Sequence, residues 1–116
     1  MDDRKQSPIF TRTSDFLIWL LEHTEKFPKS ERFRMGRKLE DCAFGFYELL
    51  IVATRSTKKK HQVLVQADVE LEKLRLYIRL SQRRKLTSLP QYQFAANSLV
   101  EIGKLLGGWL NAIPDS

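Results

Sequence analysis

Apolar residues recur along most of the chain at intervals of three and four, the spacing of one face of an α-helix. Prolines interrupt this pattern, and the residue before a proline disfavours helical backbone. The pattern predicts four helices, over residues 13–27, 30–55, 61–84 and 90–113, the first beginning at Thr13 or Ser14. Short connections between amphipathic helices favour an antiparallel up-down four-helix bundle of the all-α class. The pattern predicts a polar N-terminal tail over residues 1–12 and the bundle over residues 13–113.

Each predicted helix carries one apolar stripe for the core of the bundle. The second helix is expected to begin with an N-cap at Ser30, and residues 87–90 form a stop-and-restart signal before the last helix. The four stripes are Phe16, Leu17, Leu20 and Phe27; Phe33, Gly36, Leu39, Ala43, Phe46, Leu50 and Ala53; Leu64, Ala67, Leu71, Leu74 and Ile78; and Tyr92, Ala95, Leu99, Ile102, Leu106, Trp109 and Ile113.

The third predicted helix also carries a second apolar face. Val65, Val69, Leu76 and Leu80 lie away from its core stripe, and the polar residues 68, 72, 75 and 79 run between the two faces. Either a wide core or the N-terminal tail covers this second face, or another subunit does. We favour a subunit interface, because one bundle interior cannot cover both sides of a helix.

Two glycines on one face of the last helix indicate close packing. Gly103 and Gly107 lie four residues apart, and each costs a helix roughly 1 kcal/mol relative to alanine. The missing side chains favour close approach of another backbone, with Trp109 filling the space beside it. That backbone belongs either to the same fold or to a neighbouring copy. We assign Gly103, Gly107 and Trp109 to the oligomer interface as well.

Composition limits the class of protein. The 116 residues fit one domain, and 20 Lys and Arg against 14 Asp and Glu give a net charge of +6, which favours a polyanionic partner. The single cysteine, Cys42, excludes an intrachain disulfide and is expected to be a small buried residue in a reducing compartment. No Cys/His cluster suggests a metal. Residues 1–6 lack the apolar run of a signal peptide, and no segment is long enough to cross a membrane, so we expect a cytoplasmic protein.

Basic residues gather in two parts of the chain. One cluster surrounds the start of the second helix and the other the end of the third, so that an antiparallel hairpin places both at the same end as one positive surface. Arginine suits phosphate because its planar fork donates parallel hydrogen bonds. Local pairs such as Glu72 with Arg75 and Glu40 with Arg37 would explain part of the pattern, but residues 83–85 are expected to have no nearby acid. We therefore predict nucleic-acid binding by Arg32, Arg34, Arg37, Lys38, Arg75, Arg79, Arg83, Arg84 and Lys85.

Catalytic chemistry has little support, and we expect a non-enzymatic protein without a cofactor. Arg55 and His61 have the Arg-x5-His spacing of small all-helical ribonucleases of the HEPN type, but the supporting polar residue of that motif is not evident. Glu40 and Asp41 are adjacent and point to different sides of a helix. His23 is expected to be a partly buried packing residue.

Three segments carry a family resemblance: Phe-Pro-Lys-Ser-Glu-Arg-Phe at 27–33, Leu-Arg-Leu-Tyr-Ile-Arg-Leu at 74–80 and Glu-Ile-Gly-Lys-Leu-Leu-Gly-Gly-Trp at 101–109. They resemble the accessory variability determinant (Avd) of diversity-generating retroelements. Avd belongs to a superfamily of four-helix bundles that includes proteins encoded in ribosomal-RNA intervening sequences. The resemblance covers nearly the whole of residues 13–113.

The resemblance implies a homopentameric barrel with a positively charged surface, to which Arg75, Arg79, Arg83 and Arg84 would correspond. It also implies binding to a reverse transcriptase and to its structured template RNA, with DNA or an RNA–DNA hybrid as alternatives, in support of mutagenic cDNA synthesis. Two other interpretations stay open. One is an intervening-sequence type of protein without a reverse transcriptase, and the other is an adaptor that binds only protein.

Overall fold

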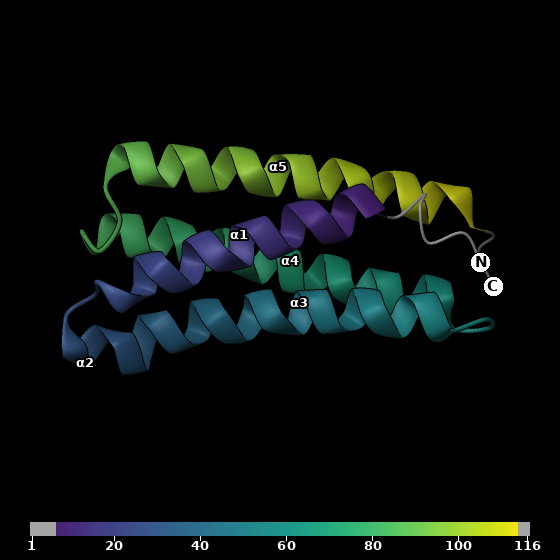
Figure 1. Ribbon diagram of the computed structural model, residues 1–116, viewed down its shortest axis with the longest axis horizontal. Coiled ribbons are helices and arrows are strands. Elements are labelled where there is room, and N and C mark those ends of the chain that lie inside the picture. Colours follow the sequence, from purple (N-terminus) through teal and green to yellow (C-terminus); the bar gives the residue numbers. More distant parts are fainter. Residues whose placement is uncertain (1–6, 114–116) are drawn as a thin grey trace.

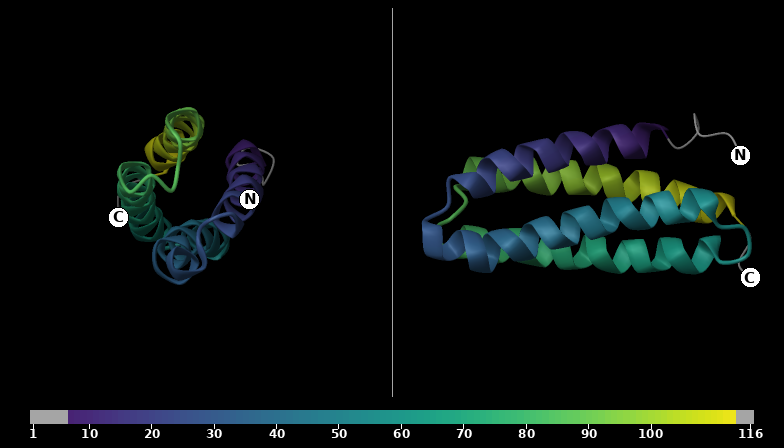
Figure 2. Two further views of the ribbon diagram at one scale, coloured as in Figure 1. Left: turned by 90° about the vertical axis from the view of Figure 1, so that its left-hand side faces the viewer. Right: turned by 60° about the horizontal axis from the view of Figure 1, so that its bottom comes forward.

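The computed structural model describes residues 7–113 as an antiparallel four-helix bundle (Figure 1). The long helices are α1 (Ser7–Glu25), α3 (Arg37–Arg55), α4 (Lys60–Arg83) and α5 (Leu89–Ala112). A short helix α2 (Lys29–Glu31) and a π-helix η2 (Arg32–Gly36) lead from α1 into α3. No strand occurs within these residues. Seen end-on, the four helices surround one shared core (Figure 2), so the predicted all-α bundle is confirmed.

The first helix begins earlier than the sequence pattern suggested. α1 starts at Ser7, so the prediction of a polar tail is wrong for residues 7–12, and residues 1–6 lie outside the described part. Pro8 does not break the helix, because a proline in the first turn has no hydrogen bond to lose. Ile9 is buried, and the ring of Phe10 lies 5.5 Å from that of Tyr47. The first turn of α1 therefore covers the end of the core.

The second predicted helix is continuous in direction but contains a π-turn. No side chain caps its start, where Pro28 occupies the N-cap, so the predicted Ser30 cap is wrong. A π-turn bonds five residues back instead of four and so shifts the side chains on either side of it relative to one another. Phe33, predicted in the core, is 64% exposed, whereas Gly36 and Leu39 are buried as predicted.

The last two helices follow the predicted pattern closely. All the predicted core positions of α4 are buried, and those of α5 are buried except for the half-buried Tyr92 and Ile113. A capping box begins α5: Gln91 N donates to Ser88 Oγ at 3.2 Å, and Ser88 N donates to Gln91 Oε1 at 2.8 Å. Such a reciprocal pair satisfies two otherwise unpaired backbone N–H groups and so fixes the start of α5.

Candidate nucleic-acid interface

The two basic clusters meet at one end of the bundle. This end, on the left in Figure 1, combines α2, η2 and the start of α3 with the end of α4. Eight of the nine residues predicted to bind nucleic acid are exposed there or nearby, and the ninth, Arg75, is half-buried. The exposed ones are Arg32, Arg34, Arg37, Lys38, Arg79, Arg83, Arg84 and Lys85.

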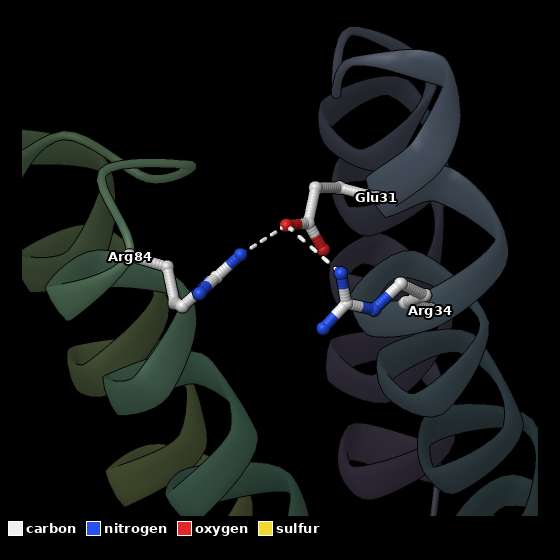
Figure 3. A network of polar contacts seen from close by, with 3 residues as sticks. All are labelled: Glu31, Arg34 and Arg84. Carbon is white, nitrogen blue, oxygen red and sulfur yellow. Dashed lines mark hydrogen bonds and ion pairs between the residues drawn. The ribbon is translucent and has the colours of Figure 1, made fainter.

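A carboxylate lies at the centre of this basic end. Glu31 is 9% exposed and contacts arginines from two elements (Figure 3): Arg84 Nη2 donates to Glu31 Oε2, and Arg34 Nη1 lies 3.9 Å from the same oxygen. The expectation that residues 83–85 have no acid nearby is therefore wrong for Arg84. A carboxylate this buried needs charged partners, so Glu31 joins η2 to the end of α4.

The structure divides the basic residues of the second helical region between two grooves. Arg32 and Arg37, one π-turn apart, line a groove between α1 and α3 that also contains Glu22, Glu25 and Glu40. Arg34 and Lys38 lie one α-turn apart and face α4 instead. Carboxylates outnumber cations in the first groove. The predicted single positive surface is thus concentrated on the α3–α4 side.

The second groove is amphipathic, and we refer to it as the Tyr77 groove. It has a volume of about 310 Å³, and it lies between the start of α3 and the end of α4. Its lining combines three apolar or aromatic side chains with three cations and one carboxylate: Met35, Tyr77, Leu80, Arg34, Lys38, Arg84 and Glu31.

The Arg75 side chain makes contacts within the bundle itself. Its Nη1 donates to Glu72 Oε1 at 3.1 Å, which confirms the predicted local pair, and its Nη2 lies 3.5 Å from the Leu99 carbonyl oxygen of α5. A Cβ atom on Gly103 would collide with this guanidinium. The space that Gly103 leaves is therefore filled by Arg75 of the same chain and not by a neighbouring backbone.

A helix-terminal turn displays the basic residues that follow Arg79. Lys85 has a φ of 64°, its N donates to the Gln82 carbonyl at 3.0 Å, and Leu86 N donates to the Ser81 carbonyl at 2.9 Å. These two bonds form a Schellman motif, in which glycine is the usual left-handed residue. Among the described residues, Arg79, Arg83 and Lys85 have no acidic partner within ion-pair distance. Their charge is available to a ligand.

A buried polar chain holds this turn against α1. His23 Nε2 and Thr87 Oγ1 are 2.8 Å apart, Thr87 Oγ1 lies 2.7 Å from Ser81 Oγ, and Ser81 Oγ donates to the Ile78 carbonyl at 2.7 Å. The imidazole also stacks on Trp19, with ring centroids 4.8 Å apart. Burial lowers the pKa of His23 below its ordinary value, and the nearby Lys26 ammonium lowers it further. His23 is thus the packing residue that the sequence suggested.

The residues predicted for an oligomer interface differ in their surroundings. Val65, Val69, Leu76 and Leu80 are all exposed, as a second apolar face requires, although Leu80 also lines the Tyr77 groove. A Cβ atom on Gly107 would meet nothing within 4 Å. Trp109 is 6% exposed and packs near Phe10 of α1, so it offers little surface to another subunit, and its interface role stays a prediction.

The two residues with the ribonuclease-like spacing lie at the turn between α3 and α4. Arg55 ends α3 and His61 lies in the first turn of α4, on either side of the connecting turn. Glu40 accepts a hydrogen bond from Thr24 Oγ1 at 2.5 Å. Burial raises the pKa of the Cys42 thiol, and the nearby Glu70 carboxylate raises it further. Residues 7–113 hold no group of three or more potential metal ligands. None of their helices has the length and hydropathy that crossing a membrane requires.

The family model described as bAvd-like matches residues 8–113, which is nearly the whole of the described bundle. The chain belongs to the bAvd-like family. This confirms the resemblance to accessory variability determinants that the three sequence segments indicated. No curated protein matched the chain.

Glu31, Met35 and Tyr77 belong to the basic end but were not predicted to function there. Glu31 follows the Pro28 break, and nothing local indicates that a residue 53 positions away pairs with it. Tyr77 lies between Leu76 and Ile78 and resembles one more apolar residue of α4. The π-turn, which has no sequence signature, sets which side chains face α4.

Proposed function

We propose that this bAvd-like protein is a non-enzymatic accessory factor of a diversity-generating retroelement. It binds the reverse transcriptase of the element and structured template RNA, and it supports mutagenic cDNA synthesis by holding enzyme and template together. Membership of the family supports this proposal, and so does the cluster of uncompensated cations at one end of the bundle. Such a role places the protein in the cytoplasm.

The observation that carries the RNA-binding part is the charge on the α4 side of the basic end. Arg79, Arg83 and Lys85 have no acidic partner among the residues described, whereas Arg84 shares Glu31 with Arg34. Phosphate contacts of this kind supply affinity with a strong salt dependence and carry little sequence information. DNA and RNA–DNA hybrids present the same phosphates, so the surface accepts them as well.

Assembly multiplies this surface. The family resemblance implies a homopentamer, and the exposed Val65, Val69 and Leu76 supply an apolar face for it. Five copies of the basic end on one particle bind a long RNA with avidity, because each further contact becomes intramolecular. The polymerase docks on a separate surface of the particle.

A matched pair of charge reversals tests the RNA-binding surface. We expect Arg79→Glu combined with Arg83→Glu to weaken binding of a labelled structured RNA, and to reduce the slope of log affinity against log salt by about two. Arg55→Glu combined with Lys59→Glu makes the same change in net charge at the opposite end of the bundle. Fluorescence anisotropy over a salt series measures both. Equal losses in the two variants would show that only net charge matters and would refute the assignment.

A second experiment tests the reverse-transcriptase partner. Under this proposal, a reverse transcriptase is expected to be encoded beside this gene and to co-purify with the chain, and cDNA synthesis on the template RNA is expected to depend on the chain. Failure of both would remove the retroelement part of the proposal.

A further inference from the structure

We propose that the Tyr77 groove holds one unpaired nucleotide of a single-stranded RNA segment. The base lies against Tyr77, Met35 and Leu80, and the adjoining phosphates lie among Arg34, Lys38 and Arg84. This inference rests on the proposed RNA-binding function and deepens it, because it states which kind of RNA segment the basic end selects.

The lining of the groove matches this ligand in two respects. Its volume of about 310 Å³ falls at the lower end of the range of small-ligand sites, which is suited to a part of a nucleotide chain and not to a helix. Its aromatic residue stands beside cations, and single-strand-binding proteins combine stacking platforms with positive grooves in this way. A duplex keeps its bases stacked inside and offers such a groove only phosphates.

Glu31 acts as a positioning residue for the cations of the groove. Its carboxylate contacts Arg34 on one wall and Arg84 on the other, as Figure 3 shows. Each guanidinium carries five N–H donors, so a contact with Glu31 leaves others for a phosphate. Holding two flexible side chains in place before binding reduces the entropy that binding costs.

Charge argues against a second copy of the chain as the occupant. Leu80 belongs to the apolar face of α4, but in the groove it is surrounded by three cations and one partly compensated carboxylate. A chain of net charge +6 is repelled by that surround, whereas a polyanion is attracted. The cationic rim therefore favours nucleic acid here, and the apolar face toward Val65 and Val69 favours protein.

The positioning role and net charge predict opposite effects of a Glu31 substitution on the affinity for single-stranded RNA. Glu31→Gln removes one negative charge from the basic end, so charge alone predicts tighter binding of any RNA. Positioning predicts several-fold weaker binding of a short, unstructured, labelled RNA, with duplex RNA of the same sequence bound as tightly as before or more tightly. Tighter binding of the single strand by Glu31→Gln would overturn the positioning role.

Substitution of Tyr77 tests the base site without changing charge. We expect Tyr77→Leu to bind the single-stranded RNA roughly tenfold more weakly, because stacking is lost while apolar bulk is kept. Tyr77→Phe, which keeps the ring, is expected to bind like the parent chain. Binding of duplex RNA is expected to be the same in all three. Circular dichroism melting shows which variants keep the fold, and if Glu31→Gln unfolds, the Tyr77 pair alone decides.

The result also separates this inference from the function on which it rests. If the parent chain binds duplex and single strand equally well, and Tyr77→Leu binds both like the parent, the groove does not select unpaired nucleotides and only the proposed RNA binding stands. If the parent chain binds neither RNA, both proposals fail.

Discussion

At the scale of single residues, His23 joins α1 to the turn that follows α4, and it makes the stability of the folded chain depend on pH. The imidazole is buried between Trp19 and Phe27 and is bonded to Thr87 in the connection before α5. Its pKa is lowered from the ordinary value of about 6.5, so the unfolded chain takes up a proton at a pH where the folded chain does not. The stabilisation is complete above about pH 6.5 and is lost as the pH falls toward the folded pKa.

We predict that His23→Gln unfolds with a smaller pH dependence than the parent chain. Glutamine keeps a polar group near Thr87 but cannot titrate, so the variant is less stable at neutral pH and loses less stability on acidification. Urea unfolding from about pH 7.5 down to about pH 5 measures this. His61→Gln, which removes the other histidine of the chain, is measured beside it as the matched control. An unchanged slope in His23→Gln would contradict the prediction.

Residue types in the sequence identified the cations but not their partners. The clusters around Arg34 and Arg83 were visible as runs of charge. Because neighbouring helices in the predicted bundle are antiparallel, both clusters were expected at the same end. The neutralisation of Arg84 by Glu31 and the insertion of Arg75 beside Gly103 depend on contacts between distant parts of the chain. Such contacts depend on how each helix is rotated about its own axis. Hydrophobic periodicity predicts that rotation only coarsely.

At the scale of elements, hydrophobic periodicity predicted all four long helices and nearly every core residue of α4 and α5. It failed at two places, both near prolines. Pro8 falls within the predicted tail, although a helix tolerates proline in its first turn. After Pro28, the five-residue turn from Arg32 to Gly36 changed the register, and Phe33 moved out to solvent. Contacts between η2 and α1, which no short-range pattern in the sequence indicates, accompany this turn.

The glycines of α5 give a prediction at this scale. A Cβ atom at position 107 meets nothing within 4 Å, so Gly107→Ala should stabilise the isolated chain by about 1 kcal/mol through helix propensity alone. Gly103→Ala should gain less, because the new methyl group displaces the Arg75 guanidinium from Leu99. Chemical denaturation at low protein concentration compares the two. Destabilisation by Gly107→Ala that grows with protein concentration would show that another subunit covers this position.

At the scale of the whole molecule, the two proposed surfaces are centred on different parts of α4, although Leu80 belongs to both. The apolar face includes Val65 and Val69, in the half of the helix nearer the α3–α4 turn, whereas the cations from Arg79 onward follow its far end. The proposed assembly and the proposed RNA binding should therefore respond to different substitutions. If a polyanion binds at the basic end, the first half of α4 stays free for contact between copies.

This separation gives the last prediction. Val69 is 53% exposed, and a charge there should break an apolar interface, so we expect Val69→Glu to lower the molar mass measured by light scattering. Val52→Glu makes the same change at a residue of α3 that is 47% exposed, and it should leave the mass unaltered. Val69→Glu should also bind a long structured RNA much more weakly because avidity is lost, while a short single strand that reaches one groove binds nearly as before. If Val69→Glu keeps the parental mass, the second apolar face of α4 does not join subunits, and the basic end then acts in single copy.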